Sequence, residues 1–298
     1  MDSDCVDPDI CYGGQCVEAT VSNTCFGPSN FEVVTHSTDR PERELSFLWS
    51  EADGVLSVAQ HAIVEELLTS IYRVLRDEFG LPVVTAPMRF RVFSDSERYD
   101  RCMLTMGKPA GSGPFYAGGR DTIFLLQSEM AWEKTLRILL HEGVHFLYHH
   151  GGLRQGALIV NEGTAVFMST ITTHQRNGAE VAVVSPHSAR YEPQLQELFE
   201  DDLLMDMETF LGLSQEEWRG YQGAYAHSYS IIYFLMELHR SDMRALLGEL
   251  LNPDAPARGL KVIIEEIYAP DSEDSFAAFV ADWEAWLGSE HQPVVFFP

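Results

Sequence analysis

Two histidines and a glutamate with helical spacing lie near the middle of the chain, in the segment HEGVH at residues 141–145. Residues four apart on an α-helix share a face, so His141 and His145 can present two imidazoles to one Zn²⁺ ion. Glu142 lies beside them and can reach a water on that metal without binding the metal itself. A metal that lowers the pKa of a water, next to a carboxylate that takes the proton, is the arrangement of zinc hydrolases.

A tetrahedral catalytic zinc site needs a third protein ligand and one open position. His149 and His150 are two turns farther along the same predicted helix, too far to reach the metal. The position six residues after His145, where some zinc peptidases have a histidine, is Gly151. The remaining candidate is Glu162 in NEGTAVFMST, which is expected on the next helix.

The apolar pattern around the motif predicts a helix that begins at residues 128–129 and ends at the glycines 151 and 152. Asn161 is predicted to cap a further helix through about Thr173. From there to the C-terminus the pattern is helical, apart from a loop around residues 185–193. The clearest helical segments are 221–240, 241–251 and 275–287.

The residues before the motif predict strands as well as helices. Strands are expected at 31–37 and 87–94, and 115–127 is expected to be a hairpin or a turn into a strand. A long helical pattern lies within 45–79, and Ser94 or Asp95 is expected to cap a short helix. Strands in the first half and helices in the second predict an α+β fold.

Composition and charge restrict the class of protein. The chain has 298 residues, of which 45% are hydrophobic, as in ordinary globular proteins. Its longest apolar runs, such as residues 231–236, are shorter than the ~18 residues of a membrane helix, so we expect no membrane span. The formal net charge of −25 repels phosphate backbones, so nucleic acid is not an expected partner.

Cysteines are concentrated at the N-terminus. Cys5, Cys11, Cys16 and Cys25 lie in a segment with almost no apolar core. We interpret residues 1–27 as a small disulfide-rich module and residues 28–298 as the main domain. A zinc knuckle is the alternative, but the C-x2-C pairs typical of knuckles are missing. The fifth cysteine, Cys102, is expected to be a buried free thiol.

The cysteine pattern also predicts where the protein is found. Disulfides form in oxidising compartments, so we expect a secreted, cell-surface or periplasmic protein. The chain begins MDSDC, which is not a signal peptide. We interpret it as a chain whose secretion signal has been replaced by Met1. The N-terminal module would then be a stalk or a partner-binding appendage.

HEGVH followed by NEG resembles the gluzincin metallopeptidases, in which the third zinc ligand is a glutamate on the following helix. The segment YQGAYAHSYSIIYFL is similar to the tyrosine-containing helix of bacterial peptidase-MA-like domains, many of which have no assigned function. The resemblance runs from about Phe31 to Leu287, and only the zinc motif in it is specific. It implies a thermolysin-like zincin domain with a small mixed sheet, an active-site helix and a mostly helical C-terminal half.

The resemblance also implies roles for individual residues. His141, His145 and Glu162 would bind one Zn²⁺ ion, and Glu142 would act as general base and then as general acid. Tyr225 would be the phenol that hydrogen-bonds the oxyanion.

Tyr229, one turn farther along, competes with Tyr225 for that role, and His227 lies between them in the sequence. Asn161 matches an asparagine that precedes the ligand glutamate in thermolysin-like enzymes. It is interpreted either as a group that orients a ligand histidine or as a helix cap. Val166 replaces an aspartate of those enzymes, so another group must orient one imidazole.

We therefore expect a secreted, single-zinc peptidase that acts on a peptide or protein. The segment 115–127 is expected to supply the edge strand along which an extended peptide binds, or simply to be a sheet edge. The alternative is a zinc-stabilised domain of the same fold that has lost turnover and acts as a binding module or scaffold. A third hypothesis is hydrolysis of a non-peptide amide.

Overall fold

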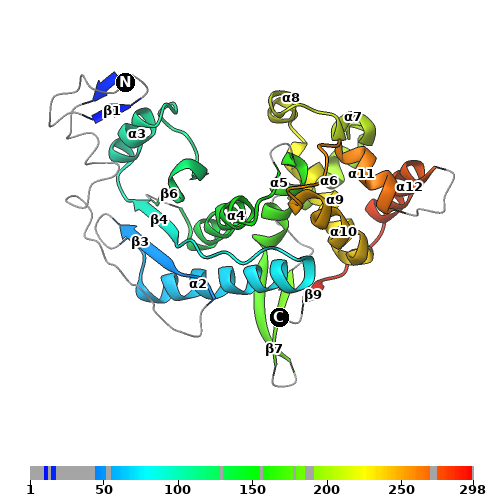
Figure 1. Ribbon diagram of the computed structural model, residues 1–298, viewed down its shortest axis with the longest axis horizontal. Coiled ribbons are helices and arrows are strands. Elements are labelled where there is room, and N and C mark those ends of the chain that lie inside the picture. Colours follow the sequence, from blue (N-terminus) through cyan, green and yellow to red (C-terminus); the bar gives the residue numbers. More distant parts are fainter. Residues whose placement is uncertain are drawn as a thin grey trace. The chain divides into compact units, whose positions relative to one another are not determined.

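The computed structural model describes residues 10–12, 15–17, 44–51, 55–127, 130–154, 157–176, 179–184, 191–268 and 274–296. Within these residues the protein is a mixture of helices and small sheets (Figure 1). The predicted α+β class is therefore confirmed. No helix in the described part of the chain is both long and apolar enough to cross a membrane.

The chain divides into two compact units, which are described separately. Unit 1 contains residues Met1–Glu65 and Thr85–Glu142, and unit 2 contains Glu66–Val84 and Gly143–Pro298. The predicted N-terminal module and the strand predicted at 31–37 lie outside the described residues. The exceptions are the backbones of β1 (Ile10–Tyr12) and β2 (Gln15–Val17), which pair antiparallel.

Unit 1 contains a four-stranded mixed sheet. Its strands are β3 (Phe47–Glu51), β4 (Met88–Phe93), β5 (Phe115–Ala117) and β6 (Thr122–Leu126). Their order in the sheet is β3-β4-β6-β5. The pairs β3–β4 and β4–β6 are parallel, whereas β5 runs antiparallel to β6 and forms an edge of the described sheet. The predicted strand at 87–94 and the predicted hairpin at 115–127 are confirmed.

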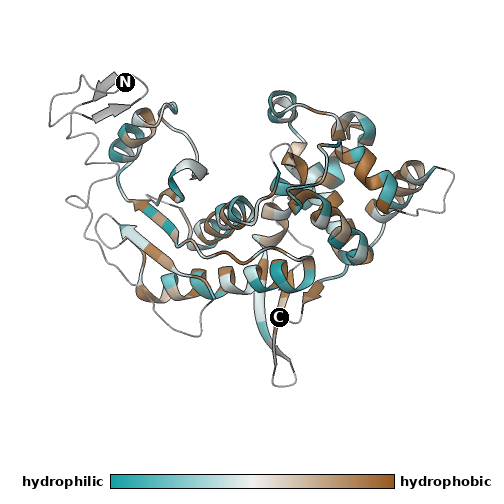
Figure 2. Cartoon of the chain, in the orientation of Figure 1, coloured by the Kyte–Doolittle hydropathy of each residue, from teal (hydrophilic) through white to brown (hydrophobic). Residues whose placement is uncertain are grey.

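The alternating sequence of β4 explains its position at the centre of this sheet. Met88, Phe90 and Val92 are fully buried. Arg89 is exposed and Arg91 half-buried, so the basic side chains project from the other face. Figure 2 shows this as alternating hydrophobic and hydrophilic bands along the strand.

Helix α3 (Ser96–Thr105) packs against β4. The side chain of Asp95 accepts a hydrogen bond from the backbone N–H of Arg98 and caps the helix, as one of the two predicted caps. Cys102, on this helix, is fully buried. It is disulfide-bonded rather than free, so the expectation of a free thiol is wrong. Its partner is not among the side chains that the structure describes.

Two long helices, α2 (Val58–Arg73) and α4 (Trp132–Gly151), each run from unit 1 into unit 2. A π-helical turn, η2 (Val74–Glu78), continues α2. In unit 2 a Cβ atom on Gly143 would lie 2.3 Å from Cδ2 of Leu68. The glycine of HEGVH thus permits a close approach of α2 and α4. Gly152 follows α4 with a φ of +82°, so the predicted glycine stop is confirmed.

The remaining helices belong to unit 2. They are α5 (Leu158–Met168), α6 (Tyr191–Glu200), α7 (Met207–Leu211), α8 (Gln215–Gly220), α9 (Ala224–Leu238), α10 (Arg240–Leu251), α11 (Leu260–Ile267) and α12 (Ser275–Leu287). Helix α9 is the centre of this unit, because it contacts α5, α6, α10 and α12. The three C-terminal segments predicted most clearly correspond to α9, α10 and α12.

The contact between α5 and α9 is especially close at Gly163. A Cβ atom there would lie 2.4 Å from the carbonyl oxygen of Ser228 and 2.6 Å from Cγ1 of Ile232. Any side chain larger than hydrogen would therefore push the two helices apart. Gly163 directly follows Glu162, so this contact fixes where the candidate third ligand lies on α5.

Two expectations about the elements are wrong, and one strand was not predicted. Two segments expected to be helical form strands instead, β7 (Ile171–Arg176) and β8 (Ala179–Val184), and β9 (Val294–Phe296) joins them in an antiparallel sheet. Strand β3 was not predicted, but the helical pattern predicted within 45–79 is confirmed by α2. Helix α5 already begins at Leu158, so Asn161 lies inside it and is not its cap.

Candidate metal centre

His141, Glu142 and His145 form a cluster on α4. Each offers a potential ligand atom, and these atoms all lie within 4.8 Å of one another. The two histidines are half-buried and Glu142 is buried. Because the three residues belong to one continuous helix, the helix itself sets the spacing that the sequence predicts.

Helix α5 brings two polar side chains to His145. Nδ1 of His145 lies 2.9 Å from Oδ1 of Asn161, and Nε2 lies 3.5 Å from Oε2 of Glu162. In the tautomer in which Nδ1–H donates a hydrogen bond to the amide oxygen of Asn161, Nε2 is unprotonated and faces Glu162. This is the tautomer that a metal ligand needs.

The distance between His145 and Glu162 fits two ligands of one ion. At 3.5 Å it exceeds the usual length of an N–H···O hydrogen bond. Two ligands at ~2.0–2.1 Å from a tetrahedral zinc ion are about 3.3 Å apart. The donors also suit the metal, because imidazole and carboxylate are its common protein ligands.

Glu142 contacts the edge strand of unit 1. Its Oε2 accepts a hydrogen bond of 2.7 Å from the backbone N–H of Tyr116 on β5. That N–H therefore points away from β6 and towards the open edge of the sheet. The Tyr116 hydroxyl in turn donates to Oδ1 of Asp121 at 3.1 Å. Sequence reasoning did not find Tyr116, because the donor is a backbone group present at almost every position.

The two candidate tyrosines have different surroundings on α9. Tyr225 is 38% exposed; its ring stacks on Tyr191 and meets Trp218 edge-on. Tyr229 is 1% exposed and packs against Phe167, on α5, and against Tyr233. The phenol of Tyr225 is therefore the more accessible of the two.

His227 lies in the helical core of unit 2. Its ring stacks between Phe210 of α7 and Trp283 of α12, and neither ring nitrogen has a hydrogen-bond partner among the described residues. Burial lowers the pKa of His227 to about 3, although Asp206 partly opposes the shift. These contacts are with core aromatic residues rather than with the candidate ligands.

Comparisons with known proteins do not assign a family. No protein-family model matches the chain, and no curated protein matches it significantly. The residues and their geometry are therefore the basis for assigning a function.

Proposed function

We propose that this protein is a zinc-dependent peptidase of the gluzincin type, in which His141, His145 and Glu162 bind one zinc ion. The observation that carries this proposal is the arrangement around His145. Asn161 holds one ring nitrogen, and the other faces Glu162 at 3.5 Å. If Asn161 were merely a helix cap, neither its contact with His145 nor the contact of His145 with Glu162 would be needed. The mixed sheet in unit 1 and the helices of unit 2 are compatible with the thermolysin-like fold that this function implies.

Glu142 is the proposed general base and acid. Zinc, when bound, polarises the carbonyl of the substrate and lowers the pKa of the attacking water. Glu142 takes the proton from that water and later gives it to the leaving amine. Its Oε2 is held by the N–H of Tyr116, so the carboxylate is fixed in orientation. The accessible Tyr225 is the proposed oxyanion donor, with Tyr229 as the competitor.

The edge strand β5 supports a peptide as the substrate. An extended chain binds to a sheet edge through outward-pointing backbone groups. The N–H of Tyr116 is such a group, and it is the one bonded to Glu142. A peptide that lies along β5 would therefore run past the proposed general base. We further propose that the protein is exported, because of its N-terminal cysteines.

The decisive experiment measures zinc content and peptide hydrolysis for the wild type, Glu142→Gln and Glu133→Gln. Glu133 is an exposed glutamate on the same helix and provides the matched control. We expect one zinc per chain in all three proteins. Loss of a general base typically slows a reaction about 10²–10⁴-fold, so Glu142→Gln should lose kcat by that factor, whereas Glu133→Gln should not.

The same measurement separates the peptidase from the scaffold. A wild type that holds zinc but cleaves no member of a broad peptide library would be a zinc-stabilised binding domain. Equal activity of the wild type and Glu142→Gln would exclude catalysis at this site. A His145→Ala variant that still holds one zinc would place the metal elsewhere.

A further inference from the structure

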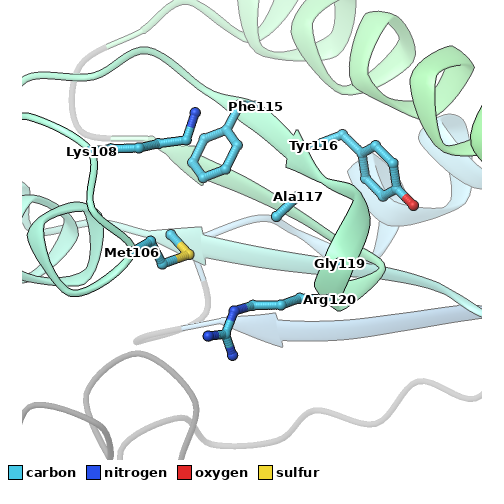
Figure 3. A pocket seen from close by; sticks show the side chains of 7 residues that line it. All are labelled: Met106, Lys108, Phe115, Tyr116, Ala117, Gly119 and Arg120. Atoms are coloured by element: carbon cyan, nitrogen blue, oxygen red, sulfur yellow. The ribbon is translucent and has the colours of Figure 1, made fainter. Parts of the chain in front are cut away.

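Unit 1 contains a pocket beside the edge strand. It has a volume of about 540 Å³, which is within the usual range of ligand sites. It is formed by β5, by the short 3-10 turn η3 (Gly118–Arg120) and by the segment that follows α3 (Figure 3). Phe115 and Ala117 of β5 line it, and Lys108 and Arg120 bring two positive charges to it.

The cation of Lys108 is held at an aromatic surface of this pocket. Its Nζ lies 3.7 Å from the centre of the Phe115 ring, and Figure 3 shows the two side chains together. The ring face attracts the ammonium group and restricts its position. Phe115 is itself supported from the sheet, because its ring stacks on Phe124 at 5.4 Å. A cation held in this way needs little further ordering when a ligand contacts it.

More arginines gather on the same face of the sheet. Arg91 pairs with Phe124 of β6 in register, and Phe124 pairs with Phe115 of β5, so their side chains project from one face. Burial, together with the positive charges of Arg89 and Arg120, lowers the pKa of Arg91 to about 10. Three arginines and one lysine therefore lie in this part of unit 1, in a protein whose net charge is −25.

The residues of β5 that line the pocket flank the residue that is hydrogen-bonded to the proposed general base. Tyr116, whose N–H bonds Glu142, lies between Phe115 and Ala117. Successive side chains of a strand point to opposite faces, and in Figure 3 the Tyr116 ring points away from Phe115 and Lys108. A peptide bound along β5 would thus place a side chain near the pocket within a residue or two of the bond to be cleaved.

We propose that this pocket binds the side-chain carboxylate of an acidic residue in the substrate. The proposal rests on the proposed peptidase function, because it assigns the substrate specificity of that site. Lys108 and Arg120 would each donate charge-assisted hydrogen bonds to the carboxylate, and Phe115 would pack against its methylene groups. The long-range repulsion from the acidic remainder of the protein is screened beyond about 8 Å at physiological salt.

The test uses peptides that differ only by one acid or amide. Each is acetylated and amidated, so that the side chain is its only carboxylate, and a glutamate or glutamine is placed at every position in turn. The readout is the ratio of kcat/KM for the glutamate peptide to that for its glutamine twin. We expect a ratio of about 10 at one position in the wild type, since such a hydrogen bond is roughly twice as strong as a neutral one.

Lys108→Gln and Arg120→Gln should each reduce that ratio towards 1. The matched control is Lys134→Gln, which removes the same charge from an exposed position on α4 and should leave the ratio unchanged. A wild-type ratio near 1 at all positions, with the glutamine peptides cleaved, would overturn the pocket proposal and leave the peptidase proposal intact. A ratio that survives both substitutions would also overturn it.

The pocket is tested separately if no peptide is cleaved. In that case the peptidase proposal fails, and the same unlabelled peptides are titrated against Glu142→Gln by isothermal titration calorimetry. Tighter binding of the glutamate peptide, lost in the double variants that also carry Lys108→Gln or Arg120→Gln, would support the pocket. Equal dissociation constants for glutamate and glutamine peptides would refute it.

Discussion

At the scale of single residues, the hydrogen bond from His145 to Asn161 orients a proposed ligand. Replacing a partner of this kind typically costs 10–100-fold in metal affinity. We expect Asn161→Ala to weaken zinc binding by about that factor, measured by competition with a chelator of known affinity. Asn161→Asp keeps the acceptor oxygen and should bind zinc much more tightly than the alanine variant. Equal affinities of Asn161→Ala and the wild type would show that Asn161 is merely a helix residue.

Because His227 is buried without a hydrogen-bond partner among the described residues, we expect the stability of the protein to fall at acidic pH. Its folded-state pKa of about 3 lies below the ordinary value of 6.5, so the unfolded chain binds a proton that the folded protein excludes. Its contribution is fully present above about pH 6.5 and is lost as the pH falls towards 3. The loss is about 1.4 kcal/mol per pH unit within that window.

His227→Phe preserves a flat ring between Phe210 and Trp283 and removes the titration. The free energy of unfolding of the wild type should therefore fall more steeply between pH 6 and pH 4 than that of the variant. Urea denaturation with a chelator present in both samples measures this difference, because metal loss then affects neither curve. Parallel pH profiles for the two proteins would mean that His227 is hydrated or paired in solution.

The sequence predicts some of these residues and not others, for a physical reason. His141, Glu142 and His145 are separated by one helical turn, so their proximity follows from local geometry. Glu162 was inferred from its place on the following helix, and the structure brings it to His145. Tyr116 was missed because a backbone N–H carries no residue-specific signal. The basic pocket was missed because Lys108, Phe115 and Arg120 meet only through a turn and a loop.

At the scale of elements, the close contact between α5 and α9 depends on Gly163. Gly163→Ala would place a methyl group against the Ser228 carbonyl, and overpacking of this kind costs about 1–3 kcal/mol or more. Gly248 on α10 is the matched control, because it is an exposed helical glycine with nothing within 4 Å of an added Cβ. Gly248→Ala should stabilise by about 0.5–1 kcal/mol. The urea denaturation midpoints of the two variants measure these effects. Equal shifts of the same sign would contradict the close packing of α5 against α9 at Gly163.

The success of element prediction varied with the kind of signal. Helices α4, α9, α10 and α12 have long periodic patterns, and β4 has a clear alternation, so all five were predicted. Strands β7 and β8 contain the β-branched run ITTHQR and the apolar run AEVAVV, which favour strands. They were assigned to helices because the helical pattern of α5 precedes them directly.

At the scale of the whole molecule, zinc would link α4 to α5 and so stabilise the native protein. A ligand at 100 times its dissociation constant adds about 2.7 kcal/mol, which corresponds to an increase of about 5 °C in the unfolding temperature of a large domain. We expect a chelator to lower the unfolding temperature by roughly this amount. The chelator should lower the unfolding temperature of Glu162→Gln by less, because this variant lacks one proposed zinc ligand. An unfolding temperature that is independent of zinc in the wild type would argue against a metal bridge.

The hydrogen bond between Tyr116 and Glu142 also affects how the protein behaves at high concentration. An unpaired strand edge can pair with the edge of another molecule and start aggregation. Strand β5 is three residues long, and its outward N–H at Tyr116 is already occupied by a carboxylate. A second copy of the chain, like a bound peptide, could pair with this N–H only by displacing the Glu142 carboxylate. We therefore expect the buried carboxylate that serves the proposed chemistry also to disfavour edge-to-edge pairing of two chains.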